Sequence, residues 1–167
     1  MSEITQEHDL RRVFIEELIA LAETDDKIVL ITCDVGFNYL EKFKERFPGR
    51  FFNFGVTEEA TVMIAVGLAV SGFKPYVYSM INFVLFRPYE MVRNGVVGHR
   101  ANVKLVGVSG SEKYKFLGFS HNMNHPNEDM VACDNMGLLA VAPRNEKEVV
   151  DYLRLSYQHQ LPSYIRL

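Results

Sequence analysis

Helix-like and strand-like apolar patterns alternate along the chain. Apolar positions recur at helical spacing in residues 11–22 and 146–159, whereas residues 28–32 and 103–108 are almost continuously apolar. The other expected elements are helices within residues 42–47, 60–72 and 83–97, and strands at residues 51–54, 76–79, 139–142 and 163–166. Strands that are apolar on both faces and alternate with helices predict a single-domain α/β fold, with a largely parallel sheet covered by helices on both faces.

The segment at 60–72 is apolar on nearly every side, which predicts a buried helix. Thr57 suits its N-cap and Gly72 its C-terminal end. Glu58 and Glu59 fall in the first turn, where the helix dipole stabilises a carboxylate by about 0.3 to 1 kcal/mol. That stabilisation alone would explain both acids. However, Glu58 also follows a predicted strand, and open α/β sheets bind ligands at the carboxyl ends of their strands. Glu58 is therefore the first candidate for a functional side chain.

Composition narrows the function classes. A chain of 167 residues with 48% hydrophobic content can bury one sizeable core, so we expect residues 10–167 to form one domain after a polar tail at residues 1–9. A net charge of -3 without a Lys/Arg run argues against nucleic acid or an anionic membrane as partner, and favours a small molecule. No apolar run reaches the roughly 18 residues of a membrane span, so we expect a cytoplasmic protein. Cys33 and Cys133 lack metal-ligand spacing and are expected to be reduced core thiols.

The longest segment without a predicted element covers residues 109–127 and contains His121 and His125. Because it follows a strand, it should lie at the same sheet edge as Glu58. A solvated loop would account for its histidines. A metal site is the other interpretation, although no pair of residues here has a recognisable ligand spacing. The chain contains neither Gly-x-Gly-x-x-Gly nor a phosphate-binding Gly-Lys-Ser/Thr motif, which argues against a generic nucleotide-binding domain.

An ordered set of motifs extends over most of the chain. It comprises Arg-Phe-Phe-Asn-Phe-Gly-Val-Thr-Glu-Glu at 50–59, Gly-Leu-Ala at 67–69, Lys-Pro-Tyr-Val-Tyr-Ser at 74–79, Arg-Pro-Tyr-Glu at 87–90, Gly-Phe-Ser-His at 118–121, Glu-Asp at 128–129 and Ala-Pro at 142–143. In this order the motifs resemble the pyrimidine-binding domain of transketolases, over about residues 10–167. The resemblance implies the pyrimidine-type domain of the thiamine-diphosphate-binding fold.

The resemblance also implies a cofactor, thiamine diphosphate, and residues that bind it. Glu58 matches the glutamate that shares a proton with the pyrimidine ring and so promotes removal of the thiazolium proton. Phe83 matches the aromatic residue that stacks on the pyrimidine, and Phe86 and Met80 match positions that line its pocket. Packing in the core would explain these three residues equally well. Asp34 matches an acid close to the thiazolium, with a helix cap or a turn as the alternative.

Candidates for substrate binding follow from the same resemblance. His121 matches a histidine that meets the hydroxyl groups of the donor sugar. The chain is longer than the family pattern between His121 and Glu128, which makes His125 a rival. Arg11 or Arg12 corresponds to a basic position that helps to hold a sugar phosphate. A plain surface-helix position remains the alternative for both arginines.

Departures from the family pattern predict a partner. The family binds the diphosphate and its divalent metal through a Gly-Asp-Gly motif, which this sequence lacks. The resemblance therefore implies a larger subunit that carries this motif and holds Mg²⁺ or Ca²⁺, with no metal ligand in this chain. We expect a heterotetramer with two copies of each chain. The family's C-terminal domain is expected to be absent or supplied separately.

The implied reaction is transfer of a C2-ketol or acyl unit from a sugar or a 2-oxo acid. Residues 109–117 differ from the family pattern, and a histidine expected near their start is missing, so the substrate stays open. Two alternatives remain. The chain could be a subunit of a two-chain 2-oxo acid decarboxylase of the sulfopyruvate type, or a non-catalytic regulatory or scaffolding subunit. Glu59 is interpreted as structural, with a shifted register that gives it the role of Glu58 as the alternative.

Overall fold

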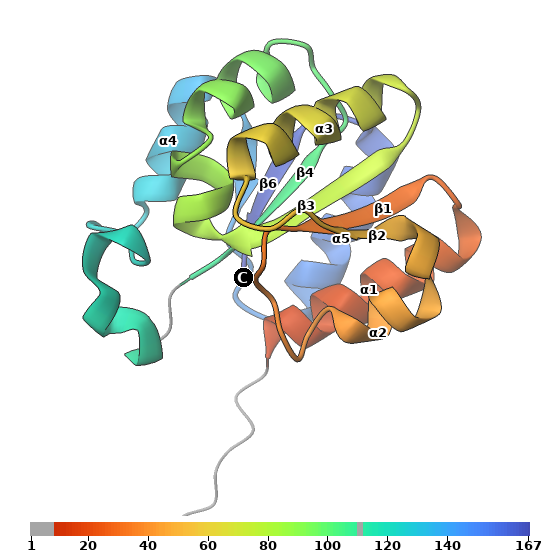
Figure 1. Ribbon diagram of the computed structural model, residues 1–167, viewed down its shortest axis with the longest axis horizontal. Helices are drawn as coiled ribbons and strands as arrows, with labels where there is room; N and C mark the ends of the chain where they lie inside the picture. Colours follow the sequence, from red (N-terminus) through yellow and green to blue (C-terminus); the bar gives the residue numbers. More distant parts are fainter. Residues whose placement is uncertain (1–8, 110–111) are drawn as a thin grey trace, which may run out of the picture.

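A six-stranded parallel sheet forms the centre of the chain, with strand order β2-β1-β3-β4-β6-β5 (Figure 1). The computed structural model describes residues 9–109 and 112–167, so residues 1–8 of the predicted tail lie outside the described residues. The strands are β1 (Ile28–Thr32), β2 (Phe51–Asn53), β3 (Lys74–Met80), β4 (Lys104–Val108), β5 (Leu139–Val141) and β6 (Ser163–Arg166). The predicted single-domain α/β fold with a parallel sheet is confirmed.

Helices cover both faces of this sheet (Figure 1). One face packs against α1 (Leu10–Thr24), α2 (Glu41–Arg46) and α5 (Glu146–His159). The other packs against α3 (Glu58–Val70), the helical segment η3 (Met91–Val97) and α4 (Glu128–Met136). The sheet therefore lies between two layers of helices.

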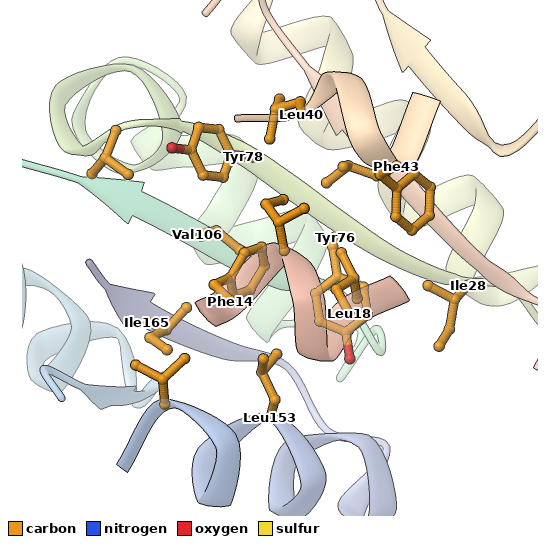
Figure 2. Packing of buried hydrophobic residues seen from close by; sticks show 14 of the residues in the cluster. Phe14, Leu18, Ile28, Leu40, Phe43, Tyr76, Tyr78, Val106, Leu153 and Ile165 are labelled. Carbon is orange, nitrogen blue, oxygen red and sulfur yellow. The ribbon is translucent and has the colours of Figure 1, made fainter. Parts of the chain in front are cut away.

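Alternate residues of each strand serve the two cores, as the period of two requires. On β3, Tyr76 and Tyr78 join the core under α1, whereas Val77 joins the core under α3. Figure 2 shows Tyr76 beside Phe14 of α1, with Leu153 of α5 completing the same cluster. Burial on both faces explains why the strands read as continuous apolar runs.

The helix α3 differs from its prediction. Its inner face, which includes Val62 and Ala65, is buried against the sheet, but Met63, Ile64 and Val70 are 42%, 41% and 74% exposed. The prediction of burial on every side is therefore wrong for the described chain, because a sheet covers only one side of a helix. An apolar face is left for another surface to cover.

The ends of α3 follow their predictions more closely. Thr57 is the N-cap residue, although its hydroxyl donates to Phe54 O at 3.0 Å instead of capping the helix. Gly72, in a left-handed conformation with φ of 89°, follows the last turn, and Phe73 N donates to Leu68 O at 3.0 Å. This is the expected glycine-terminated helix end.

The predicted helix at 83–97 is present but is not a regular α-helix. It contains two π-helical segments, η2 (Asn82–Phe86) and η3. Arg87 N donates to Asn82 O at 2.8 Å, five residues back. Pro88 follows directly and has no N–H to donate, which is consistent with a disturbed hydrogen-bond ladder at this point. Such π-turns often mark functional positions.

The segment at 109–127 is also more structured than predicted. Residues Glu112–Ser120 form 3₁₀ turns with a kink at Gly118, labelled η4. The prediction of a structureless segment is therefore wrong for this part, because local turns do not depend on apolar periodicity.

Within the described ranges, no helix is both long and apolar enough to cross a membrane.

Candidate active site

A cavity of about 530 Å³ opens at the carboxyl ends of β1, β3 and β4. The chain leaves β1 to form β2 on one side and later returns to form β3 on the other, so β1 and β3 flank the point where the strand order reverses. Open α/β sheets bind ligands at such switch points. The lining includes Glu58, Phe83, Arg87, Asp34, Met80 and His121.

Glu58 lines this cavity as the first residue of α3, with 4% of its surface exposed. A turn at Gly55, with φ of 68°, brings the chain from β2 into the helix. Oε1 of Glu58 accepts a hydrogen bond from Arg87 Nη1 at 2.7 Å. The predicted location at the carboxyl end of a strand is confirmed. A buried acid that lines a cavity at the carboxyl ends of the strands is a functional-site candidate in its own right.

Phe83 forms the aromatic wall of the cavity and is 8% exposed. The guanidinium carbon of Arg87 lies 4.1 Å from the centroid of the Phe83 ring, which places the cation over the ring face. The His121 ring meets Phe83 edge-on, with centroids 5.0 Å apart. The Phe83 ring is therefore contacted by both Arg87 and His121, and Arg87 also binds Glu58.

The structure separates the other predicted pocket residues. Met80, at the end of β3, lines the cavity beside Phe83. Phe86 does not line it and instead packs against the core under α3. In a π-helical segment the turn is wider than in an α-helix, so residues three apart do not share a face as they would in the predicted helix.

Asp34 follows β1 at the cavity rim and is exposed. Its backbone has φ of 58°, which is unusual for a residue with a side chain. Asn53 Oδ1 accepts hydrogen bonds from Asp34 N at 2.9 Å and from Gly55 N at 3.0 Å. One amide thus ties the turn that holds Asp34 to the turn that leads to Glu58.

The two candidate histidines lie in different cavities. His121 lines the cavity that contains Glu58, and its Nδ1 lies 2.7 Å from Ser120 Oγ. His125 lines an adjacent cavity of about 450 Å³, between η2 and residues 115–126. Of the two, His121 lines the same cavity as Glu58.

Asn82 holds His121 against the aromatic wall. Its Nδ2 donates to Phe119 O at 2.8 Å and to Asn122 O at 3.2 Å, on either side of His121. The same residue opens the η2 segment that carries Phe83. No pattern in the sequence indicates this role, because Asn82 lies about forty residues from the segment it holds.

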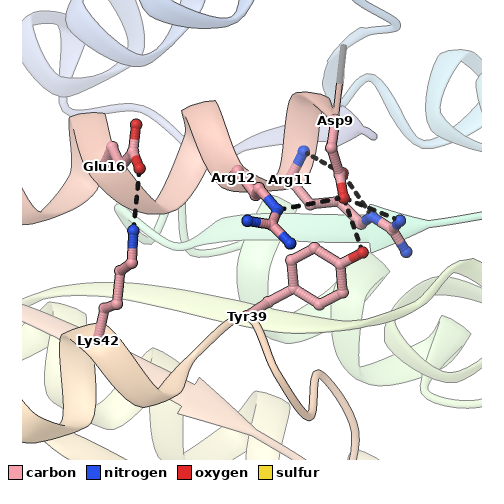
Figure 3. Close-up of polar contacts among 6 residues, drawn as sticks. All are labelled: Asp9, Arg11, Arg12, Glu16, Tyr39 and Lys42. Carbon is pink, nitrogen blue, oxygen red and sulfur yellow. Dashed lines mark hydrogen bonds and ion pairs between the residues drawn. The ribbon is translucent and has the colours of Figure 1, made fainter. Parts of the chain in front are cut away.

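Only one of the two candidate arginines lines the cavity. Arg11 lies at its edge, stacked 4.2 Å from the centroid of Tyr39 (Figure 3). Its Nε and Nη2 donate to the two carboxylate oxygens of Asp9 at 2.9 and 3.2 Å. The Arg12 side chain is 70% exposed, lies outside the lining, and comes no closer than 3.9 Å to Asp9.

Asp9 also receives a hydrogen bond from the Tyr39 hydroxyl at 2.7 Å. Partial burial acts to raise the pKa of Asp9, but the hydrogen bonds from Arg11 and Tyr39 outweigh it, and the pKa falls below its usual value. Asp9 therefore stays ionised and balances the charge of Arg11 at the cavity edge.

Arg87 was missed as a site residue, although a signal for it was present. It begins the Arg-Pro-Tyr-Glu motif and lies four residues after Phe83, which is the spacing of a helical contact.

Across residues 9–109 and 112–167, no three His, Cys, Asp or Glu side chains are grouped so as to hold a metal ion.

A family profile described as "Transketolase, pyrimidine binding domain" matches residues 6–167. The chain belongs to this family. Because the match includes every described element, the cavity at the sheet edge is a feature of a transketolase pyrimidine-binding domain.

Relatives of this pyrimidine-binding domain differ in their names. The chain is 32% identical over 158 residues to a subunit of the apulose-4-phosphate transketolase of Phocaeicola vulgatus, covering 94% of this chain and 50% of that protein. It is also 32% identical over 158 residues to the 1-deoxy-D-xylulose-5-phosphate synthase of Syntrophotalea carbinolica, covering 90% of this chain and 23% of that protein. The chain thus spans half or less of the length of these relatives.

A solved structure shows the same fold. The chain matches a protein described as "Split gene transketolase, inactive beta4 tetramer" with a TM-score of 0.82 and 25% identity, over 95% of this chain and 50% of that one. The transketolase from Campylobacter jejuni matches with a TM-score of 0.80 at 18% identity, over 96% of this chain and 26% of that one. The fold of this chain therefore occurs both in a split-gene transketolase and within a longer transketolase chain.

Proposed function

We propose that this pyrimidine-binding domain is the small subunit of a two-chain, thiamine-diphosphate-dependent enzyme that transfers a C2-ketol unit. The observation that carries this proposal is the pairing of a buried acid, Glu58, with an aromatic wall, Phe83, in a cavity at the sheet edge. One relative is named as a single subunit of a transketolase, and a structural neighbour is described as a split-gene transketolase; both names support the two-chain arrangement.

The residues of the cavity fit one half of the cofactor. An aminopyrimidine needs an apolar, aromatic surface and a group that can exchange a proton with its ring nitrogen. Phe83 and Met80 supply the first, and Glu58 supplies the second. A diphosphate with its metal ion needs acidic or amide ligands and backbone donors. The sequence contains no Gly-Asp-Gly motif, so in this proposal Mg²⁺ or Ca²⁺ and the diphosphate are held by the partner chain.

When bound, thiamine diphosphate supplies the carbon that accepts and hands over the two-carbon unit. The side chains of this domain bind and orient the reactants around it. Glu58 exchanges a proton with the pyrimidine ring nitrogen, and its burial keeps water from competing for that proton. Phe83 fixes the plane of the ring, and Asp34 contributes negative charge at the rim of the cavity.

His121 and Arg11 are the proposed contacts for the substrate. His121 can donate to or accept from a sugar hydroxyl at the cavity that Glu58 shares. Arg11 reaches the cavity edge with its charge already balanced by Asp9, which suits a hydroxyl or a weakly held phosphate. The proposed substrate is a sugar or a 2-oxo acid.

The proposed docking surface for the larger subunit consists of the exposed apolar residues near the cavity and along α3. Phe37 and Val56 line the cavity and are 63% and 69% exposed. Met63, Ile64 and Val70 extend this surface along the outer face of α3. Exposed apolar side chains that gather near a cavity suit an interaction surface. We propose a heterotetramer with two copies of each chain.

The buried, free thiols of Cys33 and Cys133 agree with assembly in a reducing compartment such as the cytoplasm. Burial raises the pKa of both thiols, that of Cys133 to about 12, which keeps them protonated and unreactive at neutral pH. Neither cysteine is needed for the proposed reaction.

Calorimetric titration of thiamine diphosphate with Mg²⁺ tests the proposal. The titration is performed with the chain alone, with a candidate partner that carries Gly-Asp-Gly, and with the purified complex. We expect tight binding to the complex alone, followed by turnover of ketose donors. Decarboxylation of a 2-oxo acid without an acceptor would instead indicate the decarboxylase alternative. A stable complex that binds no cofactor would contradict the proposal and indicate a non-catalytic subunit.

A further inference from the structure

Arg87 makes two contacts that a pyrimidine ring would itself need in this cavity. Its guanidinium lies over the face of Phe83, 4.1 Å from the ring centroid. Its Nη1 donates to Oε1 of Glu58 at 2.7 Å. A guanidinium is planar, stacks on aromatic rings and donates N–H groups in its plane, as a flat heterocycle with a ring N–H does. Within the chain, Arg87 thus resembles the ring that Glu58 and Phe83 are proposed to bind.

The two groups cannot use this position together. The guanidinium already covers one face of Phe83, and the His121 ring meets Phe83 edge-on with centroids 5.0 Å apart. Phe83 itself is 8% exposed, so little of its surface remains uncovered. A ring that stacks on the face covered by Arg87 must replace the guanidinium there.

The exposure of the two charged partners shows which of them can move. The Glu58 side chain is 4% exposed and is fixed at the first turn of α3, whereas that of Arg87 is 40% exposed. Arg87 also lies at the end of a π-helical segment, directly before Pro88. An arginine that is already partly hydrated can turn outward while remaining charged, whereas Glu58 cannot leave its pocket.

We propose that Arg87 holds the pyrimidine position in the unloaded chain and is displaced when the cofactor enters. This inference rests on the proposed function, since it assigns a residue to the same cofactor site. Before displacement, Arg87 compensates the buried charge of Glu58, which would otherwise be costly to the fold. It competes with the cofactor for the same two contacts, and so it sets the affinity of the site.

The test is titration of thiamine diphosphate with Mg²⁺ into the assembled complex, with wild-type chain, Arg87→Met and Arg87→Lys. Methionine keeps an unbranched side chain but removes both the charge and the N–H donors. We expect Arg87→Met to bind about tenfold more tightly, the factor for a site that Arg87 occupies in about nine molecules of ten. Arg87→Lys, which keeps the charge but loses the planar group, should show a smaller gain.

Thermal unfolding without and with cofactor separates competition from a structural role. Thermal unfolding should show a lower Tm for the unloaded Arg87→Met complex and a larger increase on adding cofactor, because the cofactor then replaces the missing partner of Glu58. Arg93→Met changes an exposed arginine on η3 and serves as the matched control, which should behave as wild type in both measurements.

Weaker or unchanged binding by Arg87→Met would overturn the inference, since Arg87 would then support the site or be irrelevant to it. If Arg87→Met does not fold, the affinity of Arg87→Lys decides in the same way. Binding by the wild type without a gain in either variant contradicts the displacement alone. Binding by none of the proteins contradicts the proposed function as well.

Discussion

The wall of the cavity that carries Glu58 is built from helical segments packed on the sheet, whereas the wall that carries His121 is a loop held by hydrogen bonds. Glu58 begins α3, and Phe83 lies in η2, directly after β3. His121 follows the 3₁₀ turns of η4 and is fixed through Asn82, which bonds the backbone on both sides of it. Packing against the sheet restricts the positions available to Glu58 and Phe83. Small changes in one loop, by contrast, can move His121.

This difference matches a division of roles. The proposed cofactor contacts, Glu58 and Phe83, lie on the wall made of α3 and η2, where burial against the sheet fixes them. The proposed substrate contact, His121, lies on the loop. Two relatives of this domain carry different names, an apulose-4-phosphate transketolase subunit and a 1-deoxy-D-xylulose-5-phosphate synthase. A constant wall for the cofactor and an adjustable wall for the substrate would allow such variety.

The largest effect is expected at the cofactor wall. Glu58→Gln should reduce turnover of the complex by at least about 100-fold, because proton transfer by a positioned side chain contributes about 10² to 10⁴. Steady-state assays with a ketose donor provide the measurement. Glu59→Gln is the matched control, since Glu59 is exposed on the same helical turn and should keep near-normal turnover. Similar losses in both variants would show that the first turn of α3 is needed only for folding.

The next effect is expected at the loop wall. Asn82→Ala removes both hydrogen bonds that hold His121, and a displaced side chain of this kind can cost about 10²-fold in rate. We expect kcat/KM for the donor to fall by about 10- to 100-fold while the Kd for thiamine diphosphate changes little. Asn94→Ala, at an exposed asparagine of η3, is the control. An equal loss of cofactor affinity in Asn82→Ala would mean that the two walls are not independent.

A smaller effect is expected at the cavity edge. Arg11→Gln should raise the KM for a phosphorylated sugar by a few fold, with little change in kcat, because the charge of Arg11 is already balanced by Asp9. Arg12→Gln should have no effect, since Arg12 lies outside the cavity lining. KM values for a phosphorylated and an unphosphorylated sugar provide the comparison. An effect of Arg12 alone would contradict this assignment.

The smallest effect concerns pH. Because the pKa of Asp9 is lowered in the folded chain, the stabilisation by its partners is complete above pH 3.8, the ordinary value, and is lost as the pH falls through the folded value. The contribution is below about 1 kcal/mol, since the pair is partly exposed and screened by water. Asp9→Asn keeps an N-cap side chain but should lose this pH dependence. The measurement is the free energy of unfolding of both proteins, obtained in urea over the acidic pH range. An equal dependence of this free energy on pH in the two proteins would contradict the role of Asp9.

Much of the fold could be predicted because continuous apolar runs are typical of strands buried on both faces. The runs at β1 and β4 have every residue buried. The exposed face of α3 could not be predicted, because an apolar helix has the same sequence pattern whether a sheet or a partner chain covers it. The π-helical turns before and after Pro88 depend on backbone hydrogen bonds, which apolar periodicity does not report.

The location of a site residue could be predicted where it follows from the order of neighbouring strands and helices. It could not be predicted where it depends on contacts between residues distant in sequence. Glu58 follows a strand and begins a helix, so its place at the sheet edge follows from local order. The ion pair with Arg87 joins residues 29 apart in sequence, and nothing local indicates it. The choice between His121 and His125 depends on how the loop folds over η2, which no spacing rule describes.

The measurement that tests the central claim most directly is hydrogen–deuterium exchange at the thiazolium carbon of thiamine diphosphate bound to the assembled complex, followed by NMR after quenching. If Glu58 drives removal of this proton, exchange in the wild-type complex should be at least about 100-fold faster than in the Glu58→Gln complex. Equal exchange rates in the two complexes, with the cofactor bound in both, would contradict the assignment of Glu58.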